Sequence, residues 1–208
     1  MEKRAYDVFS KATRDVCIRI IPGHFSTRHS HVNYCVDMTR VKSELGSSKA
    51  AANLFCDALG STPVDTIITL DRMKMVGAFL AHYLSHTHIN KGQNISVISP
   101  EIAGDKLLLR DNFLPYIKGK RVMLLTASAT TGKDVKSVVE GIRYYGGEPV
   151  AAASVFGGEF TCDVPFVKLF GIDDVPDYAS YSAVDCPLCR DGVKVDAVVN
   201  SYGYSKII

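Results

Sequence analysis

Small and hydroxyl-bearing residues fill one stretch between an apolar, strand-like segment and a helix-like segment, Ser128-Ala129-Thr130-Thr131-Gly132-Lys133-Asp134. Backbone N–H groups converge at a strand–loop–helix junction of this kind, and the helix dipole favours negative charge there. Threonine hydroxyls can donate to phosphate oxygens, and a glycine lets the chain approach a ligand closely. The stretch therefore predicts a phosphate site. The simpler alternative is an ordinary turn whose Ser or Thr caps the helix.

A nucleotide-hydrolysing loop of the Walker A type does not fit this stretch. That loop requires the pattern G-x-x-x-x-G-K-[ST]. Gly132 and Lys133 match its centre, but Ala127 stands where the first glycine belongs and Asp134 follows the lysine. The sequence thus argues against an ATPase.

Cys186 and Cys189 form a second candidate site, because C-x-x-C is the usual spacing of half a zinc site. Structural zinc needs two further ligands, for which the candidates are Cys162, His24, His29 and His31. The same spacing also occurs in redox pairs. Two reduced thiols in a tight turn are the third possibility, and the sequence leaves all three open.

Strand-like and helix-like segments alternate through the middle of the chain. Short β-rich or apolar runs predict strands, and apolar residues at helical spacing predict helices. The expected strands are 65–70, 94–99, 121–127, 149–156 and 164–170, and the expected helices are 47–59, 73–84 and 134–145. This alternation predicts an α/β fold with an approximately five-stranded, mostly parallel sheet flanked by helices.

The two ends of the chain have a different character. Residues 24–40 are polar and predict loops with an extended stretch near 32–38, while residues 177–208 predict irregular structure. We expect both ends to pack over the carboxyl edge of the sheet, where open α/β sheets bind ligands. The chain is then one domain over 1–208, with a core of about 46–176 and a small hood from about 1–45 and 177–208.

Composition limits the classes of partner. The chain has 208 residues and a formal net charge of +2, which gives no electrostatic reason to expect nucleic acid. No apolar run approaches the roughly 18 residues that a membrane helix needs. The first residues contain no apolar segment of signal-peptide length. We therefore expect a cytoplasmic protein that binds neither nucleic acid nor membrane.

Four segments together resemble type I phosphoribosyltransferases, and most closely the orotate phosphoribosyltransferases. Residues 121–156 resemble the family's phosphoribosyl-diphosphate loop, and residues 69–81 its diphosphate loop with the following helix. Residues 186–192 are similar to a C-terminal motif of some orotate enzymes. Residues 23–42 resemble the N-terminal hood segment, with four residues in comparable places: Ser30, Asn33, Tyr34 and Asp37.

The resemblance implies a type I phosphoribosyltransferase-like fold and a pentosyltransferase activity. Such an enzyme transfers the phosphoribosyl group of phosphoribosyl diphosphate to a base such as orotate, in nucleotide biosynthesis, with Mg²⁺ as cofactor and as a homodimer. The implied 5-phosphate residues are Ser128, Ala129, Thr130, Thr131, Gly132 and Lys133. The implied diphosphate residues are Asp71, Arg72, Lys74, Val76 and Gly77. In the stretch 101–118, Lys106 and Arg110 are the implied catalytic residues of a mobile basic loop.

The chain departs from the family pattern at the ribose site. Thr126 and Ala127 stand where the family carries two adjacent acidic residues that contact the ribose hydroxyls. Asp134 and Val76 also replace the usual Ser or Thr and the frequent Lys of orotate enzymes. Two alternatives follow: an enzyme with a rearranged ribose site, using Asp71 or another carboxylate, or a catalytically silent phosphoribosyl- or nucleotide-binding regulator. A zinc-stabilised interaction protein on the same fold is a third.

Overall fold

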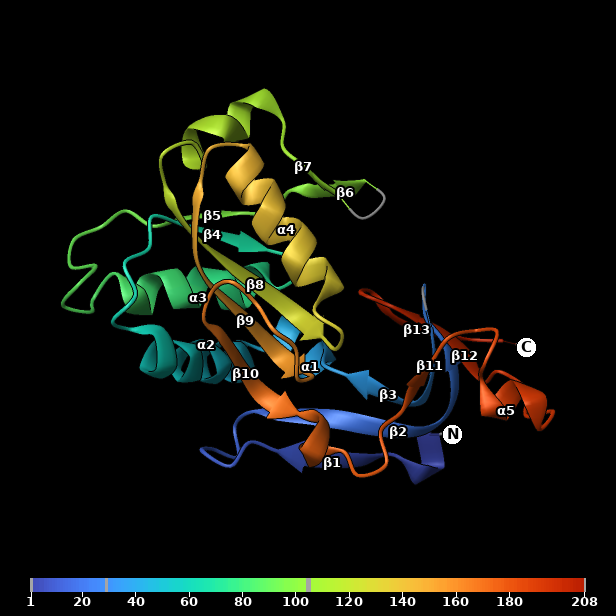
Figure 1. Cartoon of the computed structure of the whole chain (residues 1–208). Helices are drawn as coiled ribbons and strands as arrows, with labels where there is room; N and C mark the ends of the chain where they lie inside the picture. The colour runs from blue at the N-terminus through green and yellow to red at the C-terminus, as the bar shows by residue number, and fades with distance from the viewer. Residues whose placement is uncertain (1, 29, 104–105, 208) are drawn as a thin grey trace.

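The computed structural model describes residues 2–28, 30–103 and 106–207, and its centre is a five-stranded sheet (Figure 1). All pairings in this sheet are parallel, which confirms the predicted α/β class. The strand order is β10-β9-β8-β4-β5. The strands are β4 (Thr66–Thr69), β5 (Ser96–Ile98), β8 (Arg121–Ala129), β9 (Glu148–Gly157) and β10 (Phe166–Gly171).

Helices cover both faces of this sheet. On one face, α2 (Leu45–Leu59) and α3 (Lys74–Leu84) pack against alternate residues of β8 such as Met123 and Leu125. On the other face, α4 (Lys133–Tyr144) packs against Val122 and Leu124. The predicted apolar stripe of α4 is buried there, at Val135, Val138, Val139 and Ile142. Because β8 is covered on both faces, its sequence is almost continuously apolar.

A second sheet is built from the two ends of the chain and lies beyond the carboxyl ends of β8, β9 and β10 (Figure 1). Its order is β11-β3-β2-β12-β13, and β1 also pairs with β2. These strands are β1 (Tyr6–Phe9), β2 (Cys17–Ser26), β3 (His31–Asp37), β11 (Ser180–Tyr181), β12 (Ala197–Asn200) and β13 (Gly203–Lys206). It encloses a small core of its own, formed by Ile21, Phe25, Val32, Cys35 and Ala197.

The expectation of irregular structure over 177–208 is wrong, since the described part of this segment contains three strands and α5 (Pro187–Arg190). In residues 24–40 the extended stretch expected near 32–38 is confirmed as β3, but the expected loops are largely replaced by the end of β2 and by α1 (Thr39–Ser43). Strands of two to four residues are too short to show a period in sequence, and β12 exists because it pairs with β2, some 170 residues earlier.

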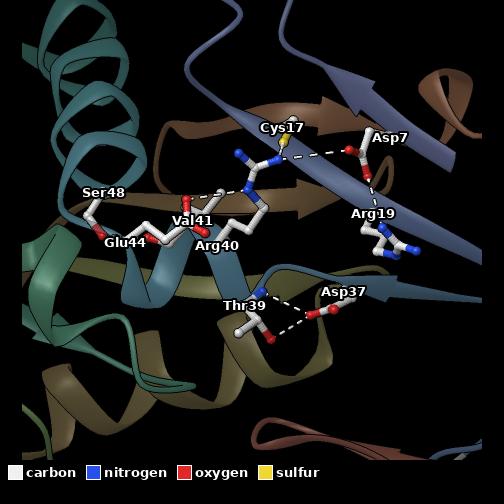
Figure 2. A network of polar contacts seen from close by, with 9 residues as sticks. All are labelled: Asp7, Cys17, Arg19, Asp37, Thr39, Arg40, Val41, Glu44 and Ser48. Atoms are coloured by element: carbon white, nitrogen blue, oxygen red, sulfur yellow. Dashed lines mark hydrogen bonds and ion pairs between the residues drawn. The ribbon is translucent and has the colours of Figure 1, made fainter. Parts of the chain in front are cut away.

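Helix α1 joins the two sheets and is held by the polar network in Figure 2. The Asp37 carboxylate accepts hydrogen bonds from the Thr39 backbone N–H (2.9 Å) and hydroxyl (2.6 Å), just before the helix. The Arg40 guanidinium contacts Cys17 Sγ at 3.1 Å and the Glu44 carboxylate at 3.3 Å. These contacts tie α1 to β2 and fix the position of Lys42, which follows on the same helix.

The segment between β5 and β8 contains regular structure in its described residues. A hairpin of β6 (Glu101–Ala103) and β7 (Lys106–Leu108) is followed by a 3-10 helix, η2 (Asp111–Tyr116). Leu107 of β7 is buried in the core beneath α4. Two further 3-10 helices are η1 (Glu2–Arg4) and η3 (Ile172–Asp174). Among the described helices, none has both the length and the apolarity needed to cross a bilayer.

Candidate active site

The strand order places a ligand site between β4 and β8. Numbered along the chain, the sheet from β5 to β10 has the order 2-1-3-4-5, so the connections leave β4 and β8 in opposite directions. Ligands of open parallel sheets bind at the carboxyl ends of the two strands where the order reverses. β4 leads there into Leu70, Asp71 and Arg72, and β8 leads into the predicted phosphate loop.

The predicted phosphate loop is shorter than its sequence implies. Ser128 and Ala129 are still strand residues, paired with Phe156 and Gly157 of β9. The loop proper is Thr130 to Gly132, and α4 begins directly at Lys133. No side-chain hydrogen bond caps α4 in the described structure. Its first N–H groups are therefore available to an anion, at the positive end of the helix dipole. The simpler alternative of a Ser or Thr cap is therefore not seen, since the residue before α4 is Gly132.

Gly132 is required at the start of α4 for two independent reasons. Its φ of +71° lies in the left-handed region, which costs other residues about 1–2 kcal/mol. A Cβ at this position would also overlap the ring of Phe160, which lies behind the loop. Glycine therefore lets the chain pass close to Phe160 at the start of α4.

The carboxylate of Asp71 lies against Thr126 and Ala127, the two positions that the family resemblance predicts at the ribose. Its Oδ2 accepts a hydrogen bond from Thr126 Oγ1 at 2.5 Å and lies 3.3 Å from the backbone nitrogen of Ala127. Thr126 and Ala127 are the two positions at which the acidic pair is missing from the sequence. The carboxylate of Asp71, which follows β4, thus lies where β8 supplies no acidic side chain. Its oxygens still have lone pairs that can accept hydrogen bonds from further donors.

Asp71 and Arg72 both have backbone angles in the left-handed region, with φ of +49° and +66°. Such a conformation costs non-glycine residues about 1–2 kcal/mol each, and it concentrates at binding and catalytic sites. Three contacts hold the turn: the two bonds of Asp71 to β8, and the guanidinium of Arg72 placed 5.1 Å from the ring centre of Tyr202. Strain maintained in this way indicates a turn shaped for a ligand.

Lys42 joins the site from α1 and was not singled out in sequence. Its half-buried ammonium donates to the carbonyl of Ser201 at 3.2 Å. Burial lowers the pKa of Lys42, while the nearby Asp71 and Asp37 oppose that shift. The only signal in the sequence was its place at the end of the hood segment 23–42. Its proximity to Asp71 depends on how α1 packs against the sheet.

The other predicted diphosphate and catalytic residues are dispersed. Lys74 is exposed at the start of α3, whereas Val76 is fully buried in the core, so only its backbone can face a ligand. A Cβ at Gly77 would lie 2.5 Å from Thr69 Cγ2, so this glycine lets α3 pack closely on β4. Lys106 is exposed, and Arg110 forms an ion pair with Glu101 at 2.8 Å.

The cysteine pair lies on the second sheet. Cys186 directly precedes α5 and Cys189 lies within it, and the side chains of His24 and His31 lie beside both thiols. Of the other ligand candidates, Cys162 instead packs against the core beneath α4. His29 lies outside the described residues.

Fold and site together define an α/β protein with a candidate anion site at the reversal of strand order. No family model matches the chain. It is 33% identical over 185 residues to the orotate phosphoribosyltransferase of Carboxydothermus hydrogenoformans, covering 85% of this chain and 88% of that protein. The chain therefore belongs to the type I phosphoribosyltransferase family, and its curated relatives are orotate phosphoribosyltransferases.

Other similarities are more limited. The orotate phosphoribosyltransferase of Thermotoga maritima is 33% identical over 81 residues, which span 38% of this chain and only 41% of that protein. The adenine phosphoribosyltransferase of Trypanosoma brucei, solved with AMP, pyrophosphate and ribose-5-phosphate, has the same fold with a TM-score of 0.56. That similarity covers 74% of this chain and 78% of that one at 18% identity.

Proposed function

We propose that the protein is an orotate-type phosphoribosyltransferase with a rearranged ribose site. The observation that carries the proposal is the Asp71 carboxylate bonded to Thr126 and Ala127, at the corner where the family's acidic pair would be. An ionised acceptor there can receive a ribose hydroxyl, and hydrogen bonds to charged groups are stronger than neutral ones. This observation favours an enzyme over a silent regulator.

In the proposed reaction, the bond from ribose C1 to diphosphate breaks and a bond from C1 to a base nitrogen forms, with diphosphate leaving. The chain's contribution is to position the two substrates and to stabilise the departing charge. The loop Thr130 to Gly132, Lys133 and the first N–H groups of α4 would hold the 5-phosphate. Lys42, Arg72 and Lys74 would oppose the charge of the diphosphate.

Mg²⁺ is part of the proposal because the substrate is a diphosphate. Such sites hold Mg²⁺ through one or two carboxylates together with substrate oxygens, and Asp71 provides a carboxylate of this kind. The ion would neutralise charge on the diphosphate. Lys106 of the hairpin and Arg110, which directly precedes η2, would act as basic groups that close over it. A homodimer in the cytoplasm, with orotate as the base, completes the proposal.

The test is turnover by the purified chain supplied with phosphoribosyl diphosphate and Mg²⁺. We expect diphosphate release and nucleotide formation that depend on orotate and are absent with adenine. Diphosphate release with another base instead of orotate would support a phosphoribosyltransferase with a different base as its substrate. Binding of phosphoribosyl diphosphate without release of diphosphate for any base would support the regulator instead, and absence of binding would reject both.

A further inference from the structure

Four potential metal ligands converge between the second sheet and the segment containing α5. They are His24, His31, Cys186 and Cys189, and their ligand atoms all lie within 4.8 Å of one another. His24 Nε2 lies 3.0 Å from His31 Nδ1, 3.5 Å from Cys186 Sγ and 3.7 Å from Cys189 Sγ. The contact between Cys189 Sγ and His31 Nδ1 is 3.2 Å.

These separations match the edges of a zinc tetrahedron. Zinc binds imidazole nitrogen at about 2.0–2.1 Å and thiolate at about 2.3 Å, which places neighbouring ligands about 3.3–3.8 Å apart. The four contacts of 3.0 to 3.7 Å overlap this range, and the two shortest lie slightly below it. Two thiolates would also balance the charge of the ion, a condition that matters because His24 and Cys186 are only 1% and 2% exposed.

The backbone around His24 is shaped to aim its ring. The pairing of β2 with β3 shifts register between Pro22 and Phe25, and a bulge of this kind redirects a side chain. The bulge is tied to the C-terminal segment, because the His24 backbone N–H donates to Asp196 Oδ2 at 2.8 Å. The Asp196 N–H in turn donates to the His24 carbonyl at 2.7 Å.

The outer contact of the His24 ring selects its neutral tautomer. Nδ1 lies 2.8 Å from the carbonyl oxygen of Val193, which can only accept, so Nδ1 is the nitrogen that donates. In the neutral ring, Nε2 then presents its lone pair to the other three ligands. A histidine whose second nitrogen donates to a carbonyl is the usual arrangement around protein-bound zinc.

We propose that His24, His31, Cys186 and Cys189 bind one structural zinc ion that fastens the C-terminal segment to β2 and β3. Four protein ligands leave no open position, so the site is structural rather than catalytic. Other interactions of this segment with the sheet are few. β12 joins β2 through two residue pairs only, and the core at this sheet contains five buried residues, so a metal ion would add substantially to the stability of the segment. The ion would also hold Tyr202, which contacts Arg72 at the candidate active site.

The test measures metal content and thermal unfolding, independently of catalysis. Reduced, metal-free chain is titrated with Zn²⁺ alone and analysed for bound metal, and we expect about one zinc per chain. Replacement by Co²⁺ should give the visible absorption of a tetrahedral site with two thiolates. Removal of zinc with a chelator should lower Tm by at least about 5 °C, since about 2 kcal/mol corresponds to that shift in a chain of this length.

Variants distinguish this site from adventitious binding. Cys189→Ser replaces the exposed ligand and should abolish stoichiometric zinc, and His31→Gln should do the same without removing a thiol. Cys162→Ser is the matched control, since that thiol lies outside the cluster, and it should retain one zinc. Failure of the reduced wild-type chain to bind zinc would overturn the proposal. Equal zinc content in Cys189→Ser and wild type, or chelator-insensitive Tm, would do so as well.

Discussion

Replacement of Asp71 by Asn separates the chemical role of this residue from its structural role. The amide oxygen of Asn can still accept from Thr126 Oγ1 and the Ala127 N–H, so the turn retains its anchors. Asn also tolerates the left-handed backbone that Asp71 adopts at φ +49°. What disappears is the negative charge that the proposed site offers to ribose hydroxyls and to Mg²⁺.

The expected effects on binding and stability differ in size. A hydrogen bond to a charged group contributes about 1.5–3 kcal/mol, so Asp71→Asn should weaken phosphoribosyl diphosphate binding by about 10- to 150-fold. The free energy of unfolding should change by less than about 1 kcal/mol, because the turn keeps its contacts, and Tm should move by less than about 4 °C.

Calorimetric titration with phosphoribosyl diphosphate and Mg²⁺ measures the first effect, and thermal unfolding measures the second. Asp57→Asn is the control, because it removes the same charge from an exposed position on α2. It should leave both quantities unchanged. Wild-type affinity in Asp71→Asn would refute the assignment and reduce Asp71 to a turn residue.

Three further substitutions test other parts of the structure. Gly132→Ala should lose phosphate binding in titrations and about 1–3 kcal/mol of stability. Gly146→Ala is the control: its φ is +80°, but its Cβ would meet only the Lys118 side chain, at 3.4 Å, so phosphate binding should be kept. Lys42→Met should weaken phosphoribosyl diphosphate binding about tenfold. It should not lower Tm, because burial already disfavours the charge of Lys42 in the folded state. A clearly lower Tm of the variant would contradict this reasoning. Asp65→Asn should cost about 1 kcal/mol in urea unfolding at pH 7, a value reduced for the partial exposure of Asp65 and Arg121. The hydrogen bond from Arg121 lowers the pKa of Asp65 to about 2 from 3.8, so this stabilisation is present above about pH 4 and is lost between pH 4 and 2. If the free energy of unfolding still differed between Asp65→Asn and wild type at pH 2 by as much as at pH 7, the charge of Asp65 would not be the source of the stabilisation.

The sequence predicted the central sheet because its strands are contiguous β-rich or apolar runs and its helices are long enough to show a period. All five expected strands of the core and the stripe of α4 occur where the apolar pattern placed them. The phosphate loop was also visible, since Gly132 and the hydroxyl residues before it are contiguous. Its length was overestimated, because the pairing of Ser128 and Ala129 with β9 depends on a neighbouring strand.

The chain ends show why other features were not visible. The strands β11, β12 and β13 contain two to four residues each, and they are stabilised by partners from distant parts of the chain rather than by a local pattern. The sequence identified Cys186 and Cys189 as half a zinc site and offered His24 and His31 among several candidates. Only the bulge in β2 and the packing of α5 against it select those two histidines.

The sequence by itself thus determined the class of fold, the family resemblance and the place of the proposed phosphate loop, because each depends on residues close together in the chain. The tertiary structure decided which groups meet at the proposed ribose corner. Asp71 and Thr126 are 55 residues apart, and they meet because β4 and β8 are adjacent parallel strands that end at the same edge of the sheet. In the sequence, β8 lacks the acidic pair of the family. In the folded protein, the carboxylate of Asp71, which follows the adjacent strand β4, lies beside those two positions.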